Sequence, residues 1–497
     1  MLVAKQRLLP KLSSICDCAA FRSGAMLLVL GLVAIYLIIA PAWSPRLLWW
    51  RYDNARLLEM ALLLTVGAMM TIPVISRGVY QSWLALGRVP GILLFVFCAA
   101  GALSVTMSGV PQVGSLQISL VLLLVCTMLV VAAAVRDTNS QAEPVLCVAV
   151  CAGALLVVLQ FWAAQAVHLL QSDAFQWHSP FLEFANVRFF SQYQSYTLLL
   201  ILLPLILFQG SRTSRLMLYV LAANFWALQW MVGTRAVWVG FVVAALIVSV
   251  FGRGHRKDWL RQQAIAVMGG LAIFVLFTGV LMPKAEAPPI PKIHSVTERG
   301  WQSVNARVTM IKGAIGMIQS HPVLGVGPGQ FGHNYSATLA AHPHNSALQF
   351  LSEYGLIAGG AAVALLAMLG LHAIGVIRAS PEPATKAGAV NLYISAALIM
   401  GLIDSLFSGN LTMPHSQILF CVVAGWLLGR NRKEPNPTAP AHRAEEVKRF
   451  ALSGVLLLAT GIALVLTVEY ASAVHHMPWW LQPNPPNLWQ YGRFTAW

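Results

Sequence analysis

Long apolar segments recur along almost the whole chain and restrict the folds open to it. Each is close to the roughly 20 residues that an α-helix needs to cross a bilayer. Backbone groups in hydrocarbon must pair within a helix or a closed barrel, and the alternating pattern of barrel strands is not seen. We therefore expect an all-α polytopic membrane protein with about 12–13 transmembrane helices. The apolar segments lie at about residues 25–41, 57–75, 91–107, 116–135, 145–170, 193–209, 215–232, 236–252, 263–282, 346–377, 389–407, 415–429 and 450–470.

The composition agrees with this class. Of the 497 residues, 58% are hydrophobic and only 10% are charged, whereas about 25% are charged in a soluble domain. The net charge of +15 does not indicate nucleic-acid binding, because a basic soluble face would be needed for it. It mostly reflects the lysine and arginine surplus of cytoplasmic loops. The seven cysteines imply no disulfide framework.

The positions of lysine and arginine predict the orientation of the chain. With the N-terminus inside and thirteen spans, 21 of the 32 lysine and arginine residues face the cytoplasm and 11 face outward. The histidine-containing outer loop then lies outside the cytoplasm. The expected parts are N-terminal membrane helices at 1–282, an outer loop at 283–345, C-terminal membrane helices at 346–470 and a tryptophan-rich outer tail at 471–497.

Several outer arginines have no topological reason to be there. Arg188 lies just before a span, Arg235 lies in a very short outer turn, and Arg299 and Arg307 lie in the long outer loop. Polar turn residues flank Arg188 and Arg235 at the mouths of spans, where they can hold an anion by bidentate contacts. The other interpretation, an interfacial arginine whose head reaches water, is preferred for Arg46 and Arg51 of the first outer loop. That loop contains Arg46, Arg51 and Arg56.

The long outer loop is predicted to contain a helix and a glycine-rich turn. Residues 295–320 have apolar side chains at helical spacing, which predicts an amphipathic helix. Glycines at 325–329 follow and indicate a tight turn that closes the loop. We expect His321 and His333 to be structural. The predicted apolar face of the helix consists of Val304, Val308, Ile311, Ile315 and Ile318.

The segment His342-Pro343-His344-Asn345-Ser346 ends this loop and opens a membrane helix. Ser346 and Gln349 can form a capping box at its start. The positive end of that helix favours anions and disfavours the imidazolium form of His344. His344 should therefore be neutral near pH 7 and able to accept a proton. A His-x-His pair can also bind a metal, but a closed site needs three or four ligands, so no metal is expected.

These segments resemble the O-antigen ligase and polymerase superfamily of bacterial cell envelopes. The turn Gly233-Thr-Arg235-Ala is similar to the family's Ser-Arg-Gly turn, with threonine in place of serine. Asn186 and Arg188 fall where the family has a polar outer turn before a span. The resemblance covers roughly residues 180–375, and its motifs are Arg307, His321-Pro-Val-Leu-Gly-Val-Gly-Pro-Gly329, His342-Pro-His344-Asn345-Ser and Leu348-Gln-Phe-Leu-Ser-Glu353-Tyr-Gly355-Leu.

The resemblance implies a GT-C-like fold in the bacterial inner membrane, with the active site on the periplasmic face. It implies glycan transfer from undecaprenyl pyrophosphate to an acceptor hydroxyl, without a metal, nucleotide or other cofactor. By the resemblance, His344 is the catalytic residue, and Arg188, Arg235 and Arg307 hold the pyrophosphate. The full set of expected substrate-binding residues is Arg188, Arg235, Arg307, His342, Asn345, Arg299 and Gln192.

Four questions stay open at the level of sequence. The acceptor is lipid A-core, which we place first, or a growing polysaccharide or a protein hydroxyl. A transporter of lipid-linked glycans is a second class, but transporters often show repeated halves, whereas this chain concentrates its polar groups on one face. Asp404, near the outer end of a span, is either a functional acid or a helix-to-helix hydrogen-bond partner. The tail tryptophans form an interfacial belt, stack on sugars or dock the acceptor.

Overall fold

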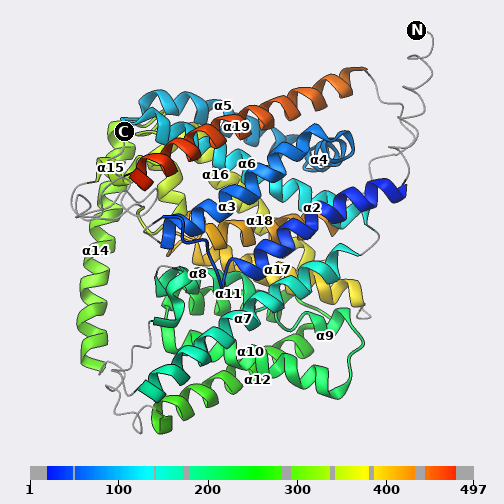
Figure 1. Ribbon diagram of the computed structural model, residues 1–497, viewed down its shortest axis with the longest axis vertical. Coiled ribbons are helices and arrows are strands. Elements are labelled where there is room, and N and C mark those ends of the chain that lie inside the picture. Colours follow the sequence, from blue (N-terminus) through cyan, green and yellow to red (C-terminus); the bar gives the residue numbers. More distant parts are fainter. Residues whose placement is uncertain are drawn as a thin grey trace.

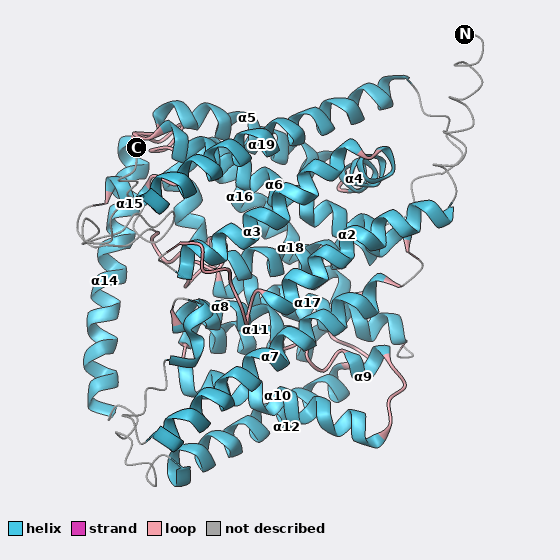
Figure 2. Ribbon diagram, in the orientation of Figure 1, coloured by secondary structure: helices cyan, strands magenta, loops and turns pink. Residues whose placement is uncertain are grey.

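The computed structural model is a bundle of helices (Figures 1 and 2). No strand occurs among the residues that it describes, which confirms the expected all-α class. The predicted tail from residue 477 onward lies outside the described residues. The described ranges are 19–48, 51–138, 141–171, 179–184, 186–281, 293–335, 342–379, 385–430 and 443–476.

The helices follow the apolar segments of the sequence. Two predicted segments, 57–75 and 193–209, are each broken by a turn into two shorter helices. The first half contains α2 (Ala19–Ile39), α3 (Arg51–Ala68), η1 (Met69–Thr71), α4 (Pro73–Ala85), α5 (Arg88–Ser104), η2 (Val105–Met107), α6 (Pro111–Asp137), α7 (Ala142–Gln171), η3 (Ser179–Phe184), α8 (Val187–Thr197), α9 (Pro204–Leu207) and α10 (Arg212–Val232). The second half contains α11 (Arg235–Phe251), α12 (Arg256–Leu276), η4 (Phe277–Leu281), α14 (Ile293–Ser320), α15 (Phe331–Asn334), α16 (Ser346–Arg378), α17 (Lys386–Asp404), α18 (Pro414–Arg430) and α19 (Arg443–His476).

Eight of the described helices are long and apolar enough to cross a membrane. A ninth span arises if α3 and α4 are counted as one, although they bend by 102° where Pro73 begins α4. Proline fits the first turn of a helix, where its missing N–H has no partner to lose. Helices α10, α11 and α18 are shorter or more polar, so length and apolarity support fewer spans than the 12–13 predicted. The eight are α2, α5, α6, α7, α12, α16, α17 and α19.

The buried centre of the bundle is formed by α6 and α17. In each, 78% of the apolar window is buried inside the molecule. Helix α18 packs along α6, and Gly425 and Gly429 of α18 lie one turn apart against the carbonyls of Met128 and Ala132. A Cβ at either glycine would overlap those carbonyls, so the glycines permit the close approach of the two backbones.

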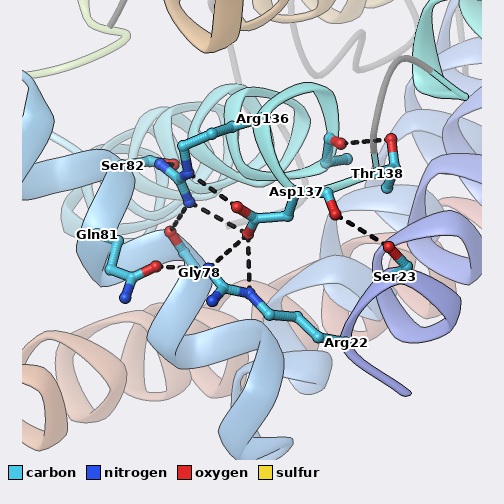
Figure 3. Close-up of polar contacts among 9 residues, drawn as sticks. Arg22, Ser23, Gly78, Gln81, Ser82, Arg136, Asp137 and Thr138 are labelled. Atoms are coloured by element: carbon cyan, nitrogen blue, oxygen red, sulfur yellow. Dashed lines mark hydrogen bonds and ion pairs between the residues drawn. The ribbon is translucent and has the colours of Figure 1, made fainter. Parts of the chain in front are cut away.

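A polar network joins the ends of α2, α4 and α6 (Figure 3). The carboxylate of Asp137 accepts hydrogen bonds from Arg22 at 2.8 Å and from Arg136 at 2.9 Å. Arg22 also donates to Gln81 of α4 at 2.5 Å, and Arg136 donates to Ser82 at 3.1 Å. The sequence places both arginines on the cytoplasmic side. Helices α14 and α15 of the predicted outer loop lie at the opposite edge of the molecule from the start of α2 (Figure 1).

Candidate active site

The histidine segment is held between α16 and the connection from α17 to α18. Asn345 caps α16, because its Oδ1 accepts the N–H of Leu348 at 2.9 Å. Its Nδ2 donates to the carbonyl of Leu406, also at 2.9 Å, and the N–H of Ser346 donates to the carbonyl of Ser405 at 2.9 Å. The predicted capping box is therefore wrong. Asn345 is the cap, and the Ser346 hydroxyl has no partner within the described residues.

His342 and His344 form a compact pair. Their rings meet edge to face with 4.4 Å between centroids. The backbone N–H of His344 donates to Nδ1 of His342 at 3.1 Å, so the neutral His342 ring carries its proton on Nε2. His344 has a φ of +53°, and no other non-glycine residue in the described ranges has a positive φ. This conformation costs roughly 1–2 kcal/mol, and such strain is concentrated at functional sites.

The surroundings keep both imidazoles neutral. Burial lowers the pKa of His342 to about 4. Burial, the neighbouring His342, and the charges of Arg188 and Arg307 hold the pKa of His344 far below its usual value. The neutral state agrees with the expectation from the helix end, but desolvation and the two arginines are the causes seen here. An anion bound to these arginines would raise the pKa of His344 toward the range of a working base.

Two of the predicted arginines, Arg188 and Arg307, act electrostatically on His344, and the third, Arg235, acts on Arg307. Arg188 lies in the first turn of α8, Arg235 begins α11, and Arg307 lies in the middle of α14. Burial lowers the pKa of Arg307, and the charges of Arg188 and Arg235 lower it further. Arg307 is therefore within electrostatic reach of both other arginines. Within the described ranges none of them forms an ion pair with a carboxylate, so together they can bind an anion such as a diphosphate.

Turn chemistry places two of these arginines. Asn186 caps α8 by accepting the backbone N–H of Arg188 on its Oδ1 at 2.8 Å. Gly233 ends α10 with a φ of +64°, a left-handed conformation that glycine adopts readily. Helix α11 then begins two residues later at Arg235. Both arginines thus lie at helix N-termini, where backbone N–H groups also favour an anion.

The structure gives less support to the other predicted substrate-binding residues. Gln192 of α8 is buried, and its Oε1 has no hydrogen-bond partner in the described part of the chain. The side-chain amide of Asn345 is occupied by its two hydrogen bonds to the backbone. Arg299 lies on α14, but its side chain lies outside what the structure describes.

Helix α14 packs through a different face from the one predicted. Its bounds, Ile293–Ser320, agree with the predicted helix over 295–320. Apolar spacing identifies a helix but does not decide which of two apolar stripes packs. The exposed side chains include Val308, Ile311 and Ile315 of the predicted face. The buried cluster consists of Met310, Ala314 and Met317 together with Val326, Phe331 and Tyr335.

The chain that follows α14 docks into a break in α16. Gly355 interrupts α16 with a φ of +74° and a ψ of −178°. On one side of the break the N–H of Leu356 donates to the carbonyl of Pro322 at 2.8 Å, and on the other the N–H of Val326 donates to the carbonyl of Ser352 at 3.0 Å. The outer loop thus supplies the backbone partners that the broken membrane helix lacks.

The glycine run fits closely into this junction. Gly325, Gly327 and Gly329 all have positive φ, and a Cβ at Gly325 or Gly327 would overlap neighbouring backbone. The buried carboxylate of Glu353 accepts the N–H groups of Gly329 at 3.1 Å and Phe331 at 3.3 Å. The predicted tight turn is present, and it also fastens α14 and its arginine to α16.

Two charged residues near the predicted outer face are wholly buried. Asp404 ends α17 and accepts hydrogen bonds from Ser408 at 2.7 Å and Asn410 at 3.0 Å. Arg56 of the predicted first outer loop donates to the carbonyl of Thr412. Residue type alone did not reveal that both groups hold the connection from α17 to α18. The polar run from Ser405 to Thr412 between two apolar segments was the signal available for it.

An apolar cavity of about 400 Å³ lies among α5, α6, α16 and α18. Leu94, Phe97 and Met128 are among its lining residues. Phe350 and Leu411, which also line it, belong to the first turns of α16 and to the connection that holds the histidine segment. A cavity with this lining suits a hydrocarbon chain and adjoins the candidate site.

Fold and site define a class: a polytopic helical membrane protein with a cluster of arginines beside two neutral histidines. Residues 197–363 match the family model described as O-antigen ligase. This confirms the resemblance of that segment to the O-antigen ligase superfamily, and the family's activity is that of a glycosyltransferase-like ligase or polymerase. The match includes Arg235, Arg307 and both histidines of the motif, whereas Arg188 precedes it. No curated protein matches the chain.

Proposed function

We propose that this protein transfers a glycan from undecaprenyl pyrophosphate to an acceptor hydroxyl, on the periplasmic face of the bacterial inner membrane. Lipid A-core is the proposed acceptor, and the fold is proposed to be GT-C-like. The observation that supports this best is the electrostatic coupling of Arg188 and Arg307 to the neutral His344, with Arg235 coupled in turn to Arg307. A lipid-linked donor presents a diphosphate to such a cluster, and its hydrocarbon tail suits the adjoining apolar cavity.

In the proposed reaction His344 is the base. The acceptor oxygen attacks the anomeric carbon of the donor sugar while its proton passes to the imidazole of His344. The bond from that carbon to the pyrophosphate oxygen breaks, and the arginines stabilise the negative charge of the leaving undecaprenyl pyrophosphate. Direct displacement inverts the anomeric centre. Burial and the charges of His342, Arg188 and Arg307 lower the pKa of His344, and a bound diphosphate that offsets the arginine charges should raise that pKa.

His342 has a supporting role in this reaction. Its Nδ1 accepts the backbone N–H of His344, so its Nε2–H is the group left to donate to a substrate oxygen. Gln192 and Arg299 remain proposed substrate contacts. Asn345 contributes by holding the loop through its cap and its bond to Leu406.

The test compares His344→Ala with His342→Ala in cells that lack the native protein, at matched expression. His344→Ala should abolish glycan transfer while donor binding persists, and His342→Ala should lose less, because loss of one positioning contact usually costs less than loss of the base. Purified protein is then given a polyprenyl-pyrophosphate oligosaccharide with lipid A-core, nascent polysaccharide or a protein acceptor in separate reactions. Transfer to one of the latter two would reassign the acceptor. Near-normal transfer by His344→Ala would contradict the enzymatic role and favour a transporter.

A further inference from the structure

The residues that join α17 to α18, numbers 405–413, underlie the histidine pair; we term them the supporting segment. We propose that this segment sets the position of His342, and that Gly409 is the positioning residue on which the His342 ring rests. The proposal deepens the proposed transfer reaction and rests on it, because the same histidine pair is concerned. It assigns a role to a part of the chain beyond the segment that matches the family model, which ends at residue 363.

Backbone hydrogen bonds attach the supporting segment to the histidine motif. The carbonyl of Ser405 accepts the N–H of Ser346 at 2.9 Å. The next carbonyl, that of Leu406, accepts the side chain of Asn345 at 2.9 Å. Two consecutive carbonyls of the segment thus hold the two residues that follow His344, so the start of α16 follows any movement of the segment.

Gly409 is in direct contact with the His342 ring. A Cβ at Gly409 would overlap Cε1 of that ring, with Nε2 and Nδ1 also within the overlap distance. The ring has little freedom to withdraw, because it is buried, because its Nδ1 accepts the N–H of His344, and because the two imidazoles pack edge to face. Only glycine therefore fits at this position with the pair in its present arrangement.

The supporting segment is itself fixed at both ends. At the α17 end, the buried carboxylate of Asp404 accepts hydrogen bonds from Ser408 and Asn410, the residues on either side of Gly409. The amide of Asn410 also donates to the carbonyl of Gly401 at 2.7 Å. At the α18 end, the buried guanidinium of Arg56 donates to the carbonyl of Thr412. A segment held in this way resists displacement, so added bulk at Gly409 is transmitted to the ring.

Movement of the His342 ring directly affects His344, the proposed base. The Nδ1 of His342 is the acceptor for the backbone of His344, the residue whose φ is +53°. Displacing His342 removes the bond that helps to hold this strained conformation. A misplacement of about 1 Å in a reacting group can reduce a rate about 100-fold. Gly409→Ala is therefore expected to act through the histidine pair and on kcat more than on the donor KM.

The first measurement is independent of activity. Full-length protein in detergent is treated with diethyl pyrocarbonate, and modification of each histidine is followed by mass spectrometry. In the unsubstituted protein the buried His342 should react more slowly than the exposed His321 and His333. Gly409→Ala should raise the His342 rate at least about five-fold, whereas Gly360→Ala, at a position with open space around it, should leave it unchanged. Unchanged protection of His342 in Gly409→Ala would overturn the proposal.

The second measurement is a double-mutant cycle in transfer from a polyprenyl-pyrophosphate oligosaccharide to lipid A-core. Gly409→Ala should lower kcat at least about ten-fold with donor KM nearly unchanged, but should cause less than about a two-fold further loss in the His342→Ala background. Equal losses in both backgrounds would show that Gly409 does not act through His342. If Gly409→Ala does not accumulate, Ser408→Ala is used instead, because it removes one hydrogen bond to Asp404 without adding bulk. It should lower kcat less than Gly409→Ala, and this loss should again nearly vanish in the His342→Ala background.

The two measurements separate the two levels of inference. If the unsubstituted protein transfers no glycan to lipid A-core, the acceptor part of the proposed function fails, yet the histidine modification still decides whether Gly409 positions His342. If transfer occurs and His342 stays protected in Gly409→Ala, the positioning role fails and the proposed function stands.

Discussion

At the scale of single residues, the candidate site combines unpaired cations with imidazoles that carry no charge. Arg188, Arg235 and Arg307 come from three different helices and form no ion pairs within the described ranges. Their repulsion is tolerable because all three lie where water or a bound anion can offset it; Arg188 and Arg235 are exposed and Arg307 is half-buried. The histidines, by contrast, are desolvated. This arrangement supports the proposed binding of a diphosphate, which would neutralise the three charges.

Arg235→Lys tests whether the arginine contact is bidentate. Lysine keeps the charge but loses the planar fork, so transfer at matched expression should fall at least about ten-fold. Arg46→Lys is the matched control, since Arg46 is also an exposed outer arginine but lies in the first outer loop, and it should transfer normally. Equal behaviour of the two variants would make Arg235 an interfacial anchor.

The pH dependence of transfer should differ between kcat/KM and kcat. In the free protein the pKa of His342 is about 4 and that of His344 is also far below normal. Both rings are therefore still neutral at pH 6, and kcat/KM should not fall between pH 8 and about 6, whereas a histidine with the ordinary pKa of about 6.5 would be only about one quarter neutral there.

The proposed donor diphosphate should raise the pKa of His344 by offsetting the charges of Arg188 and Arg307, so the acid limb of kcat should lie at higher pH than that of kcat/KM. Superimposable acid limbs in kcat and kcat/KM would contradict the coupling between the diphosphate and the base. Replacement of Arg188 by Gln should shift the limb of kcat/KM upward, because one of the charges that lower the His344 pKa is gone.

At the scale of the elements, the sequence predicted the helices better than their breaks and their packing. Apolar length located the spans because the bilayer imposes it. The turn at residues 198–203 and the interruption at Gly355 were not predicted. A continuous apolar helix and an interrupted one have the same pattern of apolar residues in the sequence. The backbone partners of the two breaks come from distant segments. The packed face of α14 was missed for the same reason, because Met310, Ala314 and Met317 pack on chain that follows the helix.

Gly355→Ala should destabilise the protein through the junction at the α16 break. The required φ of +74° with an extended ψ costs a non-glycine residue about 1–3 kcal/mol, and the new Cβ would overlap the carbonyl of Val323. We expect a lower thermal unfolding midpoint in detergent and less protein in the membrane. Gly360→Ala, five residues later in open space, should be neutral or slightly stabilising. Equal midpoints for the two variants would mean that the break is not needed for stability.

At the scale of the whole molecule, polar groups concentrate at two opposite ends of the bundle. One end has the network around Asp137 that joins α2, α4 and α6 (Figure 3). The other end has the histidine pair, α14 and the supporting segment. The sequence singled out the histidine pair, Arg188, Arg235 and Arg307 by residue type and predicts that the chemistry lies at the outer end. The contact between Gly409 and His342 could not be predicted from the sequence. It depends on how two distant connections fold: the loop before α16 and the segment between α17 and α18.

Single-cysteine labelling in a cysteine-free background tests the predicted orientation. Asn334→Cys, at an exposed position after α14, should react in intact cells with a thiol reagent that does not cross membranes. Gln209→Cys, exposed between α9 and α10, should react only after the membrane is opened. The prediction follows from the excess of lysine and arginine on the inner side. Reaction of Gln209→Cys alone in intact cells would reverse the orientation and remove the periplasmic site.

The break in α16 has a consequence for the way the chain is made. Pro322 and Val326, which bond to the interrupted backbone of α16, leave the ribosome before α16 does. In the predicted orientation they are already across the membrane when this helix is inserted. The backbone groups that pair with the break in α16 are thus already in place when the helix inserts. The amides and carbonyls at the break can therefore be hydrogen-bonded without first being exposed to lipid. Export of the preceding loop and insertion of α16 are, on this view, one coupled step of biogenesis.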